Sequence, residues 1–348
     1  MRQSPSWKGA QRSSLAEIAY PFQEGSHQPC TTMNRYLIRR LLLLIPTLLG
    51  MSLLIFAMVR LLPGDIVDAL VGMDPTFTDE QKFQMRASFG LNDPWPLQYV
   101  KWIGGMFRGD MGLSFRSREP IADQILRALP ITIELALLAI LLSLVVAVPL
   151  GILSAVRQNG PLDFWARVAG LIGLSMPSFW LATLFLLFTS LTFRWAPSVI
   201  WVSPFENLPR NLLQMLLPAL ALSVQLMAVE MRMVRSSLLE VLRQDYIRTA
   251  RAKGLSERKI LLQHGLKNAF IPVITIIGIQ LGALMGGSII IEQIFGLPGI
   301  GWTMIQAIFN RDYPVVQTAT LLLAVIFVVI NLLVDLTYSL LDPRIKYS

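Results

Sequence analysis

Cysteine and histidine are scarce in this chain of 348 residues. The single cysteine, Cys30, excludes an intrachain disulfide and any metal site built from several cysteines. The two histidines, His27 and His264, lie far apart, and neither has a neighbouring pattern of metal ligands. No Ser–His–Asp or Cys–His arrangement can be composed from them. We therefore expect no metal, no cofactor and no enzyme active site.

Charged residues are also few. They make up 15% of the chain, against about 25% in an ordinary soluble protein, while 54% of the residues are hydrophobic. The mean hydropathy of +0.56 indicates a membrane protein. Much of the net charge of +8 lies in one loop. Such a charge sets membrane topology and contacts anionic lipid, so we expect membrane lipid and no nucleic acid as partner.

A nucleotide-binding loop is absent as well, because GxxxxGK[ST] does not occur in the sequence. The glycine-rich run from Phe295 to Gly301 lacks the lysine of that motif. This chain is therefore not expected to hydrolyse ATP.

Long apolar runs are the dominant feature that is present. Crossing the hydrocarbon core takes about 20 apolar residues, and we expect six spans: Leu41–Leu62, Ile131–Val156, Ala166–Phe193, Leu212–Val229, Ala269–Ile291 and Ala319–Leu341. Arg35, Arg39 and Arg40 precede the first span and place the N-terminus in the cytoplasm. Six spans return the C-terminus to that side. The predicted fold class is an all-α integral membrane protein with both termini cytoplasmic.

The segment from Arg232 to Phe270 carries nine Lys and Arg against three Asp and Glu, which marks a cytoplasmic loop. Apolar residues recur in it at three- and four-residue steps, typical of an amphipathic helix: Leu239, Leu242, Tyr246 and Ala250. Gly254 suits a left-handed helix cap, and Ser256 suits the cap of a second helix. We expect helix, tight turn and helix, with an apolar ridge that fits a partner's groove.

The run from Tyr246 to Gly254, Tyr-Ile-Arg-Thr-Ala-Arg-Ala-Lys-Gly, resembles the cytoplasmic coupling loop of bacterial ABC importer permeases. Ala250 and Gly254 keep the spacing of that family, and Leu266 keeps its leucine. The chain departs from the general pattern where Glu, Ala, Ile and Pro would stand, at Arg248, Thr249, His264 and Lys267. This version resembles the dipeptide, oligopeptide and nickel subfamily, and within it the first of two permease subunits. The resemblance runs from about Met33 to the C-terminus.

The resemblance implies a type I ABC importer permease fold in the bacterial inner membrane. It implies a complex with a second homologous permease subunit, two ATPase subunits that hydrolyse ATP, and a periplasmic substrate-binding protein. The loop would contact an ATPase subunit through Tyr246, Ile247, Arg248, Thr249, Ala250, Lys253, Gly254 and Leu255.

Dipeptides or oligopeptides are the first choice of substrate, while glutathione and nickel complexes are carried by similar subunits. A self-sufficient channel or ion-coupled carrier is the rival function. It would need charged or broken helices at the membrane midplane, and the sequence offers few such residues.

Several polar or small residues inside the spans either pack helices together or line the pathway: Pro177, Gly278, Gly282, Gly286, Asn331 and Asp335. Pro177 is expected to kink the third span. Glu230, at the inner end of the fourth span, is expected to pair with nearby Arg232.

The outer loops, over residues 63–127 and 292–314, are expected to contact the binding protein. The candidate contact residues are Asp93, Glu292 and Pro298. Within the first loop, apolar residues from Tyr99 to Phe107 indicate a short amphipathic helix.

The predicted division of the chain has four parts. They are a disordered polar extension (1–32), the first span with a long periplasmic loop (33–125), the core transmembrane domain (126–342) with its coupling loop (230–268), and a cytoplasmic tail (343–348).

Overall fold

The computed structural model describes residues 30–61, 64, 66–71 and 77–341. These residues form α-helices, one six-residue π-helix and one isolated bridge between Leu113 and Pro120. The all-α class is confirmed. The extension predicted over residues 1–32 lies outside the described residues up to residue 29, and Cys30 already begins the first helix. The tail 343–348 also lies outside them.

Within the part of the chain that the structure describes, five single helices are long and apolar enough to cross a membrane. Four of the predicted spans, the first, second, fourth and sixth, coincide with α1 (Cys30–Leu61), α5 (Ile121–Val156), α8 (Leu208–Leu242) and α14 (Tyr313–Leu341), the first of them up to Leu61. The fifth predicted span, Ala269–Ile291, begins within α11 (Leu266–Gly287) and runs past its end into the next helix. With 36 residues, α5 is about 54 Å long at 1.5 Å per residue, well beyond the roughly 30 Å of hydrocarbon. Both α5 and α8 therefore extend out of the membrane, which predictions from apolar runs alone did not include.

The third predicted span is broken into two helices, α6 (Pro161–Ser175) and α7 (Ser178–Phe193), which meet at 96°. The expectation of a simple kink was wrong. Proline has no N–H and forces the preceding residue out of the helical conformation, and Met176 is extended, with φ −91° and ψ 118°. The carbonyl oxygen of Met176 accepts a hydrogen bond from the Gln225 side chain of α8 at 2.9 Å. A neighbouring helix thus satisfies a backbone group that the break sets free.

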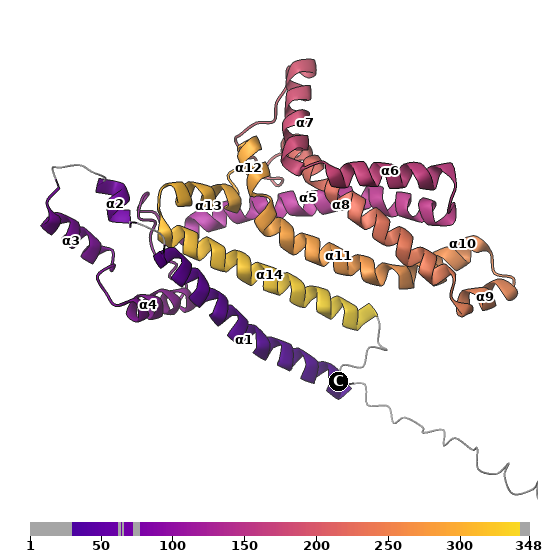
Figure 1. Ribbon diagram of the computed structural model, residues 1–348, viewed down its shortest axis with the longest axis horizontal. Coiled ribbons are helices and arrows are strands. Elements are labelled where there is room, and N and C mark those ends of the chain that lie inside the picture. Colours follow the sequence, from indigo (N-terminus) through magenta and orange to yellow (C-terminus); the bar gives the residue numbers. More distant parts are fainter. Residues whose placement is uncertain (1–29, 62–63, 65, 72–76, 342–348) are drawn as a thin grey trace, which may run out of the picture.

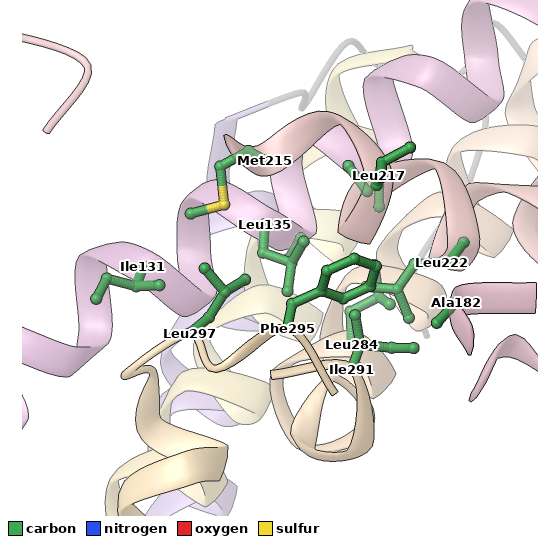
Figure 2. Close-up of a cluster of buried hydrophobic side chains, with 14 of the residues drawn as sticks. Ile131, Leu135, Ala182, Met215, Leu217, Leu222, Leu284, Ile291, Phe295 and Leu297 are labelled. Carbon is green, nitrogen blue, oxygen red and sulfur yellow. The ribbon is translucent and has the colours of Figure 1, made fainter. Parts of the chain in front are cut away.

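One long helix, α8, lies at the centre of the packing, in contact with α5, α6, α7 and α11. At its outer half, five elements contribute buried apolar side chains to one cluster, including Leu135, Ala182, Met215, Leu284 and Phe295 (Figure 2). Phe295 comes from α12 (Ile289–Phe295), a short helix that follows α11. The cluster therefore joins the broken pair to the rest of the bundle.

The long first loop folds into α2 (Ile66–Val71), α3 (Asp79–Ser88) and α4 (Trp95–Phe107), so the predicted amphipathic helix is confirmed. Phe56 of α1 packs against Tyr99 and Trp102 of α4, with ring centroids 5.5 and 6.2 Å away. Figure 1 shows these three helices at one end of the molecule, and α9 (Asp245–Ala252) and α10 (Glu257–Lys259) at the other. This arrangement agrees with a long outer loop and a basic inner loop on opposite sides.

Two of the three glycines singled out in α11 face α14. A Cβ atom at Gly278 would collide with Val334, and one at Gly282 would lie 2.7 Å from the Phe327 ring. A Cβ atom at Gly286 would have nothing within 4 Å. Two of the three glycines therefore allow close helix packing within this chain.

The polar residues of α14 also have partners inside the chain. The Asn331 side chain donates a hydrogen bond to the Phe327 carbonyl oxygen at 3.0 Å. Asp335 forms an ion pair with Arg40 of α1. Of the two roles that the sequence left open, helix packing therefore has direct structural support for Asp335, whereas the Asn331 bond lies within α14 itself.

We expect Gly278→Leu and Gly282→Leu to destabilise the protein by about 1–3 kcal/mol, because the added side chain overpacks the α11–α14 contact. Gly286→Leu is the matched control, since it adds the same side chain one turn further along where no atom of this chain is near. Thermal unfolding in detergent measures the difference. Equal stability of all three variants would contradict the packing role.

Candidate functional site

The cytoplasmic loop is a compact hairpin. After α8 ends at Leu242, the extended backbone of Gln244 (φ −69°, ψ 152°) turns the chain into α9. The hairpin continues through α10 and the π-helix Ile260–Gly265 into α11. The single amphipathic helix expected from Leu239 to Ala250 is therefore interrupted before α9, whereas the helix–turn–helix order is as predicted.

Gly254 has a φ of +76°, the left-handed conformation that its place in the sequence predicted. The N–H of Leu255 donates to the Ala250 carbonyl oxygen at 3.3 Å, and the N–H of Gly254 donates to that of Arg251 at 2.9 Å. These two bonds are those of a Schellman cap, in which a residue with positive φ closes the last helical turn. The turn is therefore held by the backbone itself.

Two side-chain contacts brace the turn. The Arg251 guanidinium donates to both Glu257 oxygens at 2.7 and 3.3 Å, and this carboxylate raises the pKa of Arg251. Ser256 precedes α10 as predicted, although its side chain makes no capping hydrogen bond. At the base of the hairpin, the Tyr246 hydroxyl accepts a hydrogen bond from Asn268 at 2.8 Å. The hairpin is thus tied to the first turn of α11.

The apolar side of α9 is buried within the chain. Ile247 is fully buried, Ala250 is 8% exposed, and both pack against the fully buried Ile260 of the π-helix. Leu242 and Leu255 complete this cluster, which we call the hairpin core. The expected open ridge of Tyr246, Ile247 and Ala250 was wrong, because the second half of the loop covers it and Tyr246 lies outside the hairpin core.

The exposed surface of the hairpin is polar and mainly basic. Arg248 has 74% of its side chain exposed and contacts Asp245 of the same helix at 3.3 Å. Thr249, Lys253, Arg258 and Lys259 are exposed as well. A partner that docks here meets mainly cations, together with the exposed side chains of Tyr246 and Leu262.

The three predicted outer contact residues differ in their surroundings. Asp93 forms an ion pair with Lys101 at 2.5 Å, which stabilises the start of α4. Pro298 is exposed and lines an open cavity of ≈ 720 Å³ together with Trp201 and Trp302. Glu292 is fully buried, so the prediction that it contacts a partner was wrong.

Glu292 is the centre of a hydrogen-bond network. Its carboxylate accepts hydrogen bonds from Thr132 at 2.8 Å, Ser288 at 2.9 Å and the Trp302 N–H at 2.9 Å. Burial raises the pKa of this carboxyl group, and the hydrogen bonds oppose that shift. The glycine-rich turn wraps around it closely, since a Cβ atom at Gly299 would lie 2.5 Å from the carboxyl carbon. These glycines after a lone Glu were the signal that sequence reasoning missed.

Two further acidic groups on the inner side were misread or missed. Glu230 is fully buried, whereas Arg232 is exposed, so the expected ion pair is not formed by these described residues. Sequence reasoning did not single out Asp163 and Arg235, which form a buried ion pair. An Asp beside an apolar run and an Arg in the basic segment were the available signals. Pro177 is exposed at the α6–α7 break and is not part of the hairpin.

Comparisons with known proteins agree with this architecture. The family described as "Binding-protein-dependent transport system inner membrane component" matches residues 147–347, and the N-terminal family that accompanies it matches residues 33–136. The chain is similar to the oligopeptide transport system permease protein AppB of Bacillus subtilis, with 41% identity over 90% of this chain and 100% of the relative. It is 38% identical to the dipeptide transport system permease protein DppB of Escherichia coli K12, over 91% of this chain and 100% of the relative.

A solved structure of the MetNI methionine ABC transporter in inward-facing conformations has the same fold. Its matched chain superposes with a TM-score of 0.53 and 20% identity, over 64% of this chain and 99% of that one. The family match covers more than half of the chain, and the sequence relatives are covered along their whole length. This chain therefore belongs to the family of inner membrane components of binding-protein-dependent transport systems.

Proposed function

We propose that this protein is the permease subunit of an ATP-driven importer that carries dipeptides or oligopeptides across the cytoplasmic membrane. The observation that carries the proposal is full-length similarity to permeases named for oligopeptide and dipeptide transport. The sequence has no nucleotide-binding motif, and the chain has a folded cytoplasmic hairpin. Both features support the hypothesis that other subunits hydrolyse ATP and contact this hairpin. The remaining subunits are a second homologous permease, two ATPase subunits and a periplasmic binding protein.

The hairpin is the contact with an ATPase subunit. Its core is complete within this chain, so the hairpin is rigid before the partner arrives, and docking does not require it to become ordered. Its exposed bases, Arg248 and Lys253 among them, favour a partner groove that carries carboxylates. Electrostatic complementarity of this kind selects the correct partner and speeds its association.

The open cavity beside Pro298 is the contact with the periplasmic binding protein. It lies between the N-terminal part of α5, the loop before α8 and α13 (Ile300–Phe309). Ile200 and Val199 on its rim are 71% and 64% exposed. Exposed apolar side chains around a hollow are typical of a protein contact.

The broken α6–α7 pair is a feature that a self-sufficient carrier would share. Transport tests separate the two functions. In vesicles with the purified complex, we expect uptake of labelled di- and tripeptides only when ATP, the ATPase subunits and the binding protein are present. Uptake by the permease alone would establish a carrier. Glutathione or nickel uptake without peptide uptake would retain the importer and change its substrate.

We expect Ala250→Glu to open the hairpin, because it puts a carboxylate into the hairpin core without a cation to pair with it. Thr249→Glu is the matched control, since it adds the same charge at the adjacent exposed position. Faster tryptic cleavage of the hairpin in the first variant, and not in the control, is the expected result. Equal protease resistance of the two variants would show that Ala250 is not part of a packed core.

We expect Gly254→Val to weaken docking of the ATPase subunits and to lower uptake, because a β-branched residue at positive φ is strained by about 1–2 kcal/mol. A Cβ atom here has nothing within 4 Å, so the strain comes from the backbone alone. Gly254→Asn is the matched control, because asparagine tolerates the left-handed conformation. Both variants are expected in the membrane at normal levels. Wild-type docking and uptake of Gly254→Val would falsify the assignment of this hairpin.

A further inference from the structure

A buried ion pair joins three helices near the cytoplasmic hairpin. Asp163, in the first turn of α6, is fully buried and accepts hydrogen bonds from Arg235 Nε at 2.7 Å and Nη2 at 2.9 Å. It also accepts from the Ser154 hydroxyl of α5 at 2.5 Å and from the Asn159 N–H of the α5–α6 turn at 3.0 Å. Arg235 belongs to α8, and 18% of its side chain is exposed. We call Asp163, Arg235 and Ser154 the inner latch.

Stability alone is a weak reason for such a pair. Removing two charges from water costs so much that apolar side chains of similar volume often stabilise a protein equally well or better. What the pair adds is geometry, because a guanidinium that donates two parallel bonds to a carboxylate fixes distance and orientation together. The inner latch therefore sets how the α5–α6 turn sits on α8.

The same three helices are in close contact beyond the inner latch. A Cβ atom at Gly151 of α5 would lie 2.8 Å from the Val234 side chain, and one at Gly170 of α6 would lie 2.8 Å from Met231. These contacts hold α5 and α6 against α8, but apolar surfaces can slide over each other. The inner latch opposes sliding, since a small shift breaks its directional hydrogen bonds.

Arg235 lies near the end of α8 that leads into the hairpin, so the inner latch is placed between the hairpin and the bundle. Seven residues separate Arg235 from Leu242, where α8 ends, a distance of about 10 Å along a continuous helix. The hairpin begins three residues further on, at Asp245. On the other side, Asp163 lies in the helix that leads to the Met176–Pro177 break and to α7. A displacement of the hairpin therefore reaches the inner latch before it reaches the outer half of the bundle.

We propose that the inner latch passes movement of the hairpin from α8 to α5 and α6, so that Asp163 and Arg235 are positioning residues that couple ATP hydrolysis to transport. This inference rests on the proposed function, in which ATPase subunits displace the hairpin. Without the inner latch, the ATPase subunits still bind and hydrolyse ATP, but α5 and α6 do not follow the movement of α8.

The main variant removes both charges together, as Asp163→Leu with Arg235→Met, so that neither is left buried without its partner. We expect this double variant to fold and to retain bound ATPase subunits. We expect its uptake per ATP hydrolysed to fall about tenfold, within the range of coupling between sites. Arg167→Met is the matched control, because Arg167 is half exposed, approaches the Asp163 carboxylate no closer than 3.6 Å, and donates its 3.4 Å hydrogen bond to the backbone carbonyl of that residue. It should leave uptake per ATP unchanged.

A second variant and a distance measurement keep the test decisive if the double variant does not fold. Arg235→Lys keeps the charge and loses the two parallel bonds, so uptake per ATP should still fall while thermal stability changes little. Spin labels at the exposed Gln158 and Gln263, with Cys30 replaced, report the distance between the α5–α6 turn and the hairpin. This distance should stay constant on ATP binding in the parent protein and change in the variants.

The outcomes separate the two proposals. Normal uptake per ATP and a constant label distance in the folded double variant, or in Arg235→Lys if the double variant does not fold, would overturn the role of the inner latch and leave the importer intact. A parent protein that shows no ATP-dependent uptake with its ATPase subunits would overturn the proposed function itself.

Discussion

Hydrocarbon offers no hydrogen bond to a backbone or side-chain group, and the structure is arranged around this constraint. The described spans are helices, whose backbone groups satisfy each other. Where a span breaks, at Met176, the Gln225 side chain supplies the missing donor. The buried carboxylates of Asp163 and Glu292 are likewise surrounded by N–H and O–H groups from distant parts of the chain. The polar groups therefore decide which helices meet and in what register.

The helix α8 connects the bundle to the cytoplasmic hairpin. It contacts α5, α6 and α7 along the bundle and continues beyond the membrane to the hairpin. Small residues such as Gly151 and Gly170 let its neighbours approach closely, the usual basis of helix association in lipid. Because one rigid helix joins the hairpin to the bundle, the two ends of the molecule are mechanically connected without a flexible linker between them.

The spans other than the broken third one, the topology and the left-handed turn at Gly254 could be predicted from sequence, because hydropathy, charge bias and backbone conformation are local properties. Which surface covers an apolar face is a tertiary property. Periodicity marked Ile247 and Ala250 as apolar, but only the fold brings Ile260 over them. The partners of Glu292 and Asp163 stand 160 and 72 residues away, at Thr132 and Arg235, so no local pattern identifies these partners.

The buried hairpin core changes how docking is to be understood. A helix that lays its apolar ridge into a partner's groove gains affinity from burying that ridge. Here the second half of the loop already buries the apolar side of α9, so docking does not bury it further. What remains for recognition is a preformed shape with exposed bases such as Arg248 and Lys253. Arg248 stands where the general pattern of ABC importer permeases has a glutamate, so this hairpin presents the opposite charge at that position. A groove suited to the glutamate version would present cations to Arg248, and like charges across an interface reject a wrong partner.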